Sequence, residues 1–109
     1  MITFTEYQVS AVKTAIYGDQ NKIFYPALGL AGEAGEVCNK VKKIFRDNNG
    51  QLTGKKREEL AAEIGDVLWY CAALANDLGL SLDFIARMNI TKLNARKEAG
   101  TIGGSGDNR

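Results

Sequence analysis

The chain has 109 residues, of which 45% are hydrophobic, and a formal net charge of +1. This length allows one compact domain, and the composition is typical of a globular protein rather than a disordered one. The near balance of acids and bases leaves no broad basic footprint, so we expect no nucleic-acid partner.

No segment is typical of secretion or of membrane insertion. The first ten residues, MITFTEYQVS, lack the basic segment and apolar run of a signal peptide. The longest apolar run, VLWYCAALA at residues 67–75, is too short to span a bilayer. We therefore expect a cytoplasmic protein without a membrane partner. In that reducing compartment Cys38 and Cys71 are predicted to be small buried hydrophobic residues rather than a disulfide.

Helical patterns account for most of the chain, which contains one proline and no β-branched alternation. Pro26 suits a first helical turn, Gly79 suits the position that ends a helix, and Ser81 suits an N-cap. A turn-rich connection, RDNNGQLTGKK, occupies residues 46–56. Four helices are predicted, at about Thr5–Tyr17, Pro26–Arg46, Arg57–Leu78 and from the Ser81 cap to about Ala99.

Two of these helices carry an apolar stripe. In the first helix Phe4, Tyr7, Ala11 and Ala15 share one face. In the third helix the stripe has a 3.6-residue period and consists of Leu60, Ile64, Val67, Cys71, Leu74 and Leu78.

The prediction is therefore an all-α fold, with a four-helix domain over residues 1–99 and a glycine-rich tail over residues 100–109. A short bundle has little core of its own, so we expect it to be completed by homo-oligomerisation.

Two pairs of acids stand out. Glu33 and Glu36 are three residues apart on one helix face, and Glu63 and Asp66 repeat that spacing on the next helix. If the two helices pack antiparallel, the four carboxylates come together, and they repel one another unless cations lie between them. Oxygen ligands without any histidine or thiolate suit Mg²⁺, with Mn²⁺ possible.

Glycines surround the first acid pair, although each costs about 1 kcal/mol in a helix interior relative to alanine. Gly29 precedes Glu33 by one turn and Gly32 precedes Glu36 by one turn. Missing side chains there would let another helix or a bulky anionic ligand approach the backbone. Tight helix packing alone is the alternative explanation.

Glu58 and Glu59 stand near the predicted start of the third helix, where acids favour the helix dipole. Glu59 lies one turn before Glu63, so an outer-shell metal contact is the alternative. The absence of histidine excludes Ser-His-Asp and Cys-His catalysis and His-based zinc sites.

A basic face lies on the fourth helix, where Asn89, Lys92 and Arg96 are spaced for one side. A solvated surface would explain them. Beside a metal site they would instead bind polyphosphate. Asn89 would supply an amide, Lys92 a compact positive charge and Arg96 a guanidinium that can donate two parallel hydrogen bonds. The tail, GTIGGSGDNR, is either a disordered end or a loop whose backbone N–H groups surround phosphates. It contains no P-loop.

The combination resembles the MazG-like family of all-α nucleoside triphosphate pyrophosphohydrolases. The resemblance rests on Glu33-x-x-Glu36, on EIGD at residues 63–66, and on Asn89-x-x-Lys92-Leu-x-x-Arg96, and it covers about residues 25–97. The tail resembles that of a short phage- or cassette-type subgroup, although relatives often carry a histidine near Gly103.

The resemblance implies a Mg²⁺-dependent enzyme that cleaves nucleoside triphosphates between the α- and β-phosphates, for nucleotide-pool housekeeping. It implies a homodimer or homotetramer whose sites lie near subunit interfaces. The four acids would hold metal, and Glu33 or Glu36 would orient or deprotonate the attacking water. Lys92 and Arg96 would offset phosphate charge, and Asn89 would contact phosphate or sugar.

Phe24, Trp69 and Tyr70 either stack on the base or, as we favour, pack in the core. Two further hypotheses are a non-catalytic nucleotide- or metal-binding bundle and an interaction module whose acids are surface charge.

Overall fold

The computed structural model describes residues 1–108 and is all-helical, which confirms the predicted fold class. Within those residues no strand occurs, and no helix is both long and apolar enough to cross a bilayer. The elements in chain order are α1 (Phe4–Val12), the short 3₁₀ turn η1 (Asp19–Asn21), α2 (Phe24–Asn48), α3 (Gly54–Asp77) and α4 (Leu82–Ala99).

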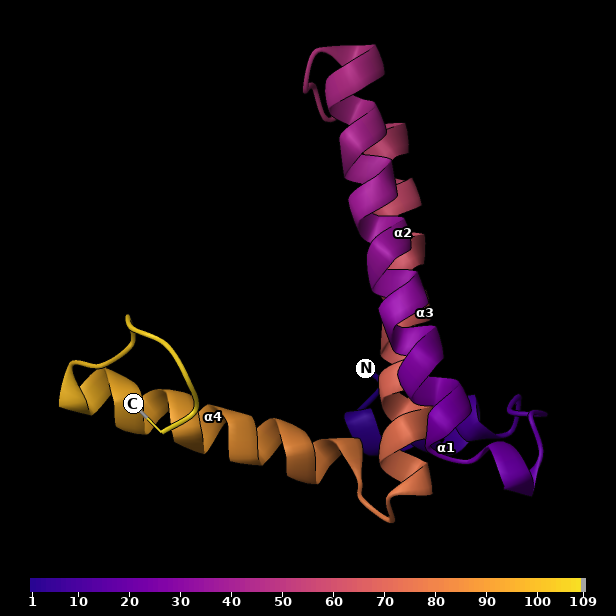
Figure 1. Ribbon diagram of the computed structural model, residues 1–109, viewed down its shortest axis with the longest axis vertical. Coiled ribbons are helices and arrows are strands. Elements are labelled where there is room, and N and C mark those ends of the chain that lie inside the picture. The colour runs from indigo at the N-terminus through magenta and orange to yellow at the C-terminus, as the bar shows by residue number, and fades with distance from the viewer. Residues whose placement is uncertain (109) are drawn as a thin grey trace.

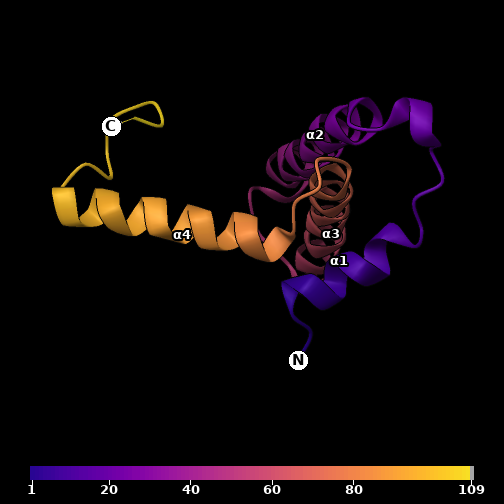
Figure 2. The same cartoon turned by 90° about the horizontal axis from the view of Figure 1, so that it is seen from below.

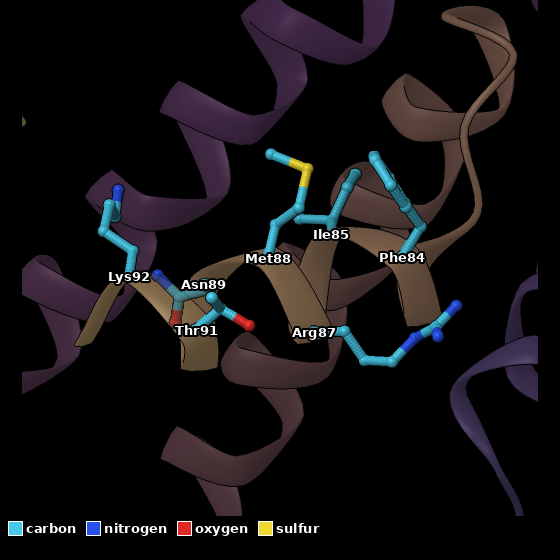
Figure 3. Close-up of a pocket in the computed structure, with 7 residues that line it drawn as sticks. All are labelled: Phe84, Ile85, Arg87, Met88, Asn89, Thr91 and Lys92. Carbon is cyan, nitrogen blue, oxygen red and sulfur yellow. The ribbon is translucent and has the colours of Figure 1, made fainter. Parts of the chain in front are cut away.

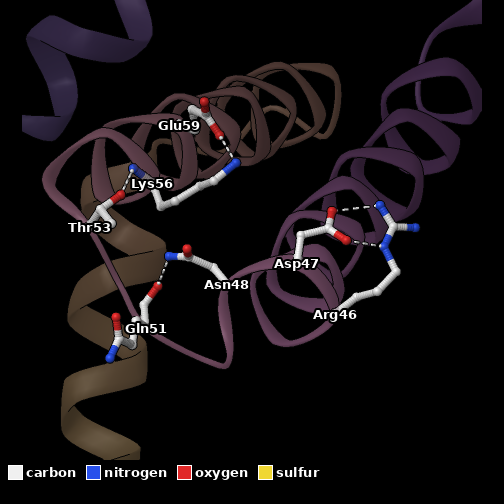
Figure 4. Close-up of polar contacts among 7 residues, drawn as sticks. All are labelled: Arg46, Asp47, Asn48, Gln51, Thr53, Lys56 and Glu59. Atoms are coloured by element: carbon white, nitrogen blue, oxygen red, sulfur yellow. Dashed lines mark hydrogen bonds and ion pairs between the residues drawn. The ribbon is translucent and has the colours of Figure 1, made fainter.

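The helices α2 and α3 form a long antiparallel hairpin that dominates the molecule (Figure 1). A tight turn joins them, in which Asn49 and Gly50 both adopt positive φ angles, of 53° and 74°. The Asn48 side chain donates a 2.8 Å hydrogen bond to the carbonyl of Gln51 and closes this turn (Figure 4). These contacts make the connection shorter than the eleven residues expected from composition.

The helix α3 starts three residues before its predicted start at Arg57. The hydroxyl of Thr53 caps it by accepting the Lys56 N–H at 3.2 Å. The first turn therefore contains no acid, and the predicted dipole role of Glu58 and Glu59 is wrong. Glu59 instead faces Lys56, with 3.4 Å between carboxylate and ammonium (Figure 4).

The helix α1 is shorter than predicted and ends at Val12 rather than Tyr17. The Thr14 hydroxyl donates a 2.7 Å hydrogen bond to the carbonyl of Ala11, and the Thr14 N–H bonds the same oxygen at 3.0 Å. This local bonding competes with the next helical turn and stops the helix. Ala15 consequently lies outside α1 and cannot belong to its apolar face.

The start of α2 depends on the far end of α3. The Asp77 carboxylate accepts the Tyr17 hydroxyl at 2.8 Å and the Ile23 N–H at 2.9 Å. Ile23 has a φ of 69°, which is unusual for a β-branched residue. The predicted position of Pro26 in the first turn is confirmed, and its side chain is fully buried.

A small core lies at the foot of the hairpin, where α1 crosses α3 beside the start of α4 (Figure 2). Gln8, which is 7% exposed, ties the three helices together. Its amide nitrogen donates to the carbonyls of Ala72 and Leu80, and its oxygen accepts the Leu82 N–H at 2.9 Å. Because all three partners are backbone groups, this side chain fixes the corner between α3 and α4.

The core differs from the predicted stripe. Its fully buried members are small, namely Ala72, Ala73 and Ala75, while Ile64 and Leu78 are 57% and 51% exposed. Cys38 is also exposed, so its predicted burial is wrong within this chain, whereas Cys71 is half-buried. Both cysteines are free thiols, as expected.

The helix α4 extends away from the hairpin as a separate arm (Figures 1 and 2). Gly79, at a φ of 74°, ends α3, and the Leu80 N–H bonds the carbonyl of Ala75 at 2.9 Å. Ser81 then caps α4 by accepting the Phe84 N–H at 3.1 Å. Both predicted boundary roles are confirmed.

One glycine sets how closely the hairpin helices pack. A Cβ atom built on Gly29 would overlap the Tyr70 ring, so α2 and α3 can keep this spacing with another residue at position 29 only if that ring shifts. Gly32 and Gly35 have no such neighbour within 4 Å. Helix packing therefore explains Gly29, and open space surrounds Gly32 on the described part of the chain.

We expect Gly29→Ala and Gly35→Ala to change stability in opposite directions. The methyl group at position 29 displaces the Tyr70 ring and lowers the free energy of unfolding by about 1–3 kcal/mol. The methyl group at position 35 meets nothing and raises it by about 0.5–1 kcal/mol through helix propensity. Urea unfolding followed by circular dichroism measures both. A destabilising Gly35→Ala would mean that another molecule fills the open space.

Candidate metal and nucleotide site

Three of the four predicted carboxylates come together across the hairpin. Glu33 on α2 and Glu63 and Asp66 on α3 each offer an oxygen within 4.8 Å of the others. Glu33 and Glu63 are half-buried, whereas Asp66 is exposed. The cluster therefore opens to solvent on one side.

Antiparallel register explains this meeting. The Gly29–Tyr70 contact fixes one level of the hairpin. Glu33 follows Gly29 by four residues, and Asp66 precedes Tyr70 by four residues. One turn along each helix therefore brings these two acids to the same level.

The charges in this cluster repel one another. Partial burial, together with the negative charges of Asp66, Glu63 and Glu36, raises the pKa of Glu33 above its ordinary value. Glu33 therefore binds a proton more readily than an isolated glutamate, and the same repulsion favours a bound cation.

Glu36 stands at the edge of this group. Its charge acts on Glu33, but its carboxylate lies outside the set of oxygens within 4.8 Å, and its side chain is exposed. Glu59, ion-paired with Lys56, also lies outside that set.

An aromatic pocket of about 340 Å³ adjoins the acids. Its lining combines the carboxylates of Glu33 and Asp66 with the side chains of Thr14, Trp69 and Tyr70. Trp69 and Tyr70 meet edge to face with ring centroids 4.9 Å apart, and both are half-buried. Flat apolar surfaces therefore lie directly beside the anionic cluster.

A second pocket, of about 300 Å³, continues past Trp69 and is lined by Tyr17 and Tyr25 among others. The rings of Tyr17 and Tyr25 stack with their centroids 4.8 Å apart. Between the pockets, the Trp69 indole N–H donates a 2.7 Å hydrogen bond to the Thr14 hydroxyl. Phe24, by contrast, is 73% exposed and lines neither pocket, so its predicted core packing is wrong.

Three residues that line these pockets were not predicted from the sequence, namely Thr14, Tyr17 and Tyr25. All three fall near the ends of α1 and α2, where local pattern predicted the wrong boundary or an unremarkable helix. A threonine just after a helix end was the one available signal, because its hydroxyl can both donate and accept.

The predicted basic residues lie elsewhere. Asn89, Lys92 and Arg96 are on α4, the arm that leads away from the hairpin (Figure 1). Over residues 1–108 neither Lys92 nor Arg96 forms an ion pair with the acidic cluster. Lys92 and Arg96 do share a face, because both contact Asp107 of the tail, at 3.2 Å each.

Comparison with known proteins identifies the family. Residues 26–101 match the MazG nucleotide pyrophosphohydrolase domain. The chain belongs to the MazG family. It is also 51% identical to Gene 37 protein of Mycobacterium phage L5, over 94% of this chain and 96% of that protein. No solved structure matches it significantly.

MazG proteins act on nucleotides as pyrophosphohydrolases and depend on a divalent metal. The cluster of this MazG chain fits such an ion. It offers three hard oxygen donors from two helices, and their mutual repulsion favours a bound cation. No histidine or thiolate belongs to the cluster, which disfavours zinc.

We expect Glu33→Gln to raise the melting temperature by a few degrees in chelator at pH 7, because a neutral amide relieves the repulsion. The raised pKa of Glu33 means that the folded state binds its proton more tightly than the unfolded state. The contribution of Glu33 to stability therefore becomes more favourable as the pH falls towards that pKa, and the variant lacks this contribution.

In chelator the variant should have the higher melting temperature, whereas with Mg²⁺ the wild type should have it, because the ion raises the melting temperature of the wild type alone. Scanning fluorimetry across pH, with Glu58→Gln as a control acid on α3, measures both effects. A lower melting temperature of Glu33→Gln in chelator would contradict the repulsion.

Proposed function

We propose that this protein is a Mg²⁺-dependent hydrolase of nucleoside or deoxynucleoside triphosphates. It would cleave between the α- and β-phosphates and release a monophosphate and pyrophosphate, as nucleotide-pool housekeeping in the cytoplasm. The observation that carries this proposal is the meeting of Glu33, Glu63 and Asp66 within 4.8 Å, beside an aromatic pocket, in a MazG chain.

Glu33, Glu63 and Asp66 would hold the cation, with Glu36 completing the set from its exposed edge; Mn²⁺ suits the same donors. When bound, the metal would neutralise phosphate charge and make water more acidic. Glu33 or Glu36 would accept the proton of the attacking water as the α–β phosphoanhydride bond breaks.

The aromatic pocket would receive the base. Trp69 and Tyr70 offer ring faces next to the carboxylates, and the Thr14 hydroxyl lies between the two pockets. Stacking on an aromatic ring tolerates any base, whereas the Thr14 hydroxyl, which donates to Ala11 and accepts from Trp69, keeps one lone pair that could accept a directional hydrogen bond. A nucleobase bound in this pocket would place the phosphates of the same nucleotide at the acidic cluster.

Phosphate-binding side chains would then come from a second copy of the chain. Asn89 and Lys92 lie on an arm that leads away from the acids of their own chain (Figure 1). An arm that packs against a partner's hairpin would bring them to the partner's site.

Two measurements of size support such an assembly. The accessible surface is 7885 Å², against about 5,900 Å² expected for a compact monomer of this mass. The Cα radius of gyration is 16.7 Å, against about 13 Å for a compact domain of about 100 residues. The excess surface exceeds the roughly 800 Å² per partner that a stable interface needs.

The arm also carries an apolar face. Phe84, Ile85 and Met88 rise from one side of α4 in a row that ends at Lys92, and they line a hollow of about 770 Å³ (Figure 3). Phe84 and Met88 are 42% and 55% exposed. A homodimer or homotetramer that covers this face would bury apolar area and complete the site together.

We expect the purified protein to convert nucleoside triphosphates to monophosphate and pyrophosphate with Mg²⁺, which phosphorus NMR identifies over a panel of bases and sugars. Glu36→Gln and Asp66→Asn should lower turnover by at least about 100-fold with helical circular dichroism intact. Glu59→Gln, outside the cluster, serves as the control.

If the products are diphosphate and orthophosphate, the metal assignment stands, but the proposed cleavage between the α- and β-phosphates is wrong. Full turnover in both acid variants would reject the metal assignment. A folded, Mg²⁺-binding protein that hydrolyses no nucleotide would favour the binding role instead.

We expect light scattering to give a mass that is a multiple of the 11.8 kDa chain. Met88→Glu places a charge on the apolar face of α4 and should shift the mass towards one chain while abolishing turnover. Asn94→Glu, which adds the same charge elsewhere on α4, should change neither. A monomeric wild type with full activity would contradict completion of the site by a partner.

A further inference from the structure

The residues that follow α4 turn back along it (Figures 1 and 2). Gly100 ends the helix at a φ of 72°, and the Thr101 N–H bonds the carbonyl of Arg96 at 2.8 Å. Gly104 and Gly106, with φ angles of 90° and 82°, allow the further turns. The returning chain brings Asp107 beside the basic face of α4.

Asp107 contacts both cations of that face. Its carboxylate oxygen Oδ1 accepts hydrogen bonds from Lys92 Nζ and from Arg96 Nη2, each at 3.2 Å. Arg96 Nη2 also donates to the backbone carbonyl of Asp107 at 3.0 Å. Hydrogen bonds from Lys92 and Arg96 hold the pKa of Asp107 below its usual value, so the contact is ionic at neutral pH.

The two cations differ in how accessible they are. Arg96 is 6% exposed, and its Nη2 group donates both of its hydrogen bonds to Asp107 of the tail, while its buried Nε has no hydrogen-bond partner among the described residues. The Lys92 side chain is 41% exposed, and its ammonium retains donors beyond the one given to Asp107. A triphosphate can therefore reach Lys92, but it cannot reach Arg96 unless the tail detaches.

We propose that Asp107 is a positioning residue, which clamps the tail to α4 through Arg96 and orients the Lys92 ammonium towards the substrate's phosphates. This inference rests on the proposed function and changes the role of Arg96 from phosphate ligand to anchor of the tail. A lysine side chain loses much rotamer freedom when it binds, so holding it in advance favours substrate binding.

The opposite arrangement makes a distinct prediction. If the Asp107 carboxylate stood where a phosphate oxygen binds, the tail would compete with substrate, and loosening it would tighten binding. The sign of the change in KM therefore separates a clamp from a competitor.

The kinetic experiment compares Asp107→Asn with Asp83→Asn in the full-length protein. Asp83 pairs with Arg87 on the same helix at 3.0 Å, so its variant makes the same charge change away from the tail. We expect Asp107→Asn to raise KM by about tenfold with kcat within about twofold, and Asp83→Asn to change neither. An unchanged or lowered KM in Asp107→Asn overturns the proposal.

A second measurement separates this inference from the reaction itself. Backbone ¹⁵N relaxation should show residues 102–108 ordered in the wild type and in Asp83→Asn, but mobile in Asp107→Asn and in Arg96→Lys. A mobile wild-type tail overturns the clamp.

If the wild type hydrolyses no nucleotide, calorimetry with inorganic triphosphate and Mg²⁺ replaces KM. Weaker binding by Asp107→Asn supports the clamp even though the proposed reaction fails. Equal binding, or none by the wild type, overturns it.

Discussion

The contact between the Gly29 backbone and the Tyr70 ring governs the geometry of the site. It allows the two long helices to approach closely, and it fixes their register. One turn further along each helix, that register brings Glu33 to Asp66. The glycine thus lowers helix propensity at one position, and in return the close approach that it allows sets the spacing between carboxylates on different helices. The same ring that sets the spacing also lines the pocket beside the acids.

The packing of the hairpin and the electrostatics of its carboxylates oppose each other at this cluster. Partial burial and the charges of the neighbouring carboxylates raise the pKa of Glu33, and a protein selected for stability alone would avoid such an arrangement. The surrounding scaffold is small, with a core made mainly of alanines at the foot of the hairpin. Much of the support therefore comes from directed contacts, such as those that Gln8 makes with three backbone groups.

The arm joins three features of the chain in one element. It carries an exposed apolar row, a basic face with Lys92 and Arg96, and the contacts of that face with Asp107 of the tail. In the proposed assembly, substrate binding and oligomerisation would depend on each other. The acidic side chains lie on the hairpin, whereas the basic side chains lie on α4, and these are different parts of an extended chain. A change on this helix would then affect binding at a site formed mainly by other helices.

The sequence by itself determined the features that depend on residues within about one helical turn of each other. Caps at Ser81 and Gly79 and the spacing of the two acid pairs are readable because their partners lie within one turn. Tertiary structure decided the rest: α2 starts where Asp77 binds Ile23, and Trp69 faces a threonine 55 residues away. The burial of Arg96 under the tail belongs here too, because no helical period shows where a glycine-rich segment returns. Such contacts join residues distant in sequence, so only the packed chain reveals them.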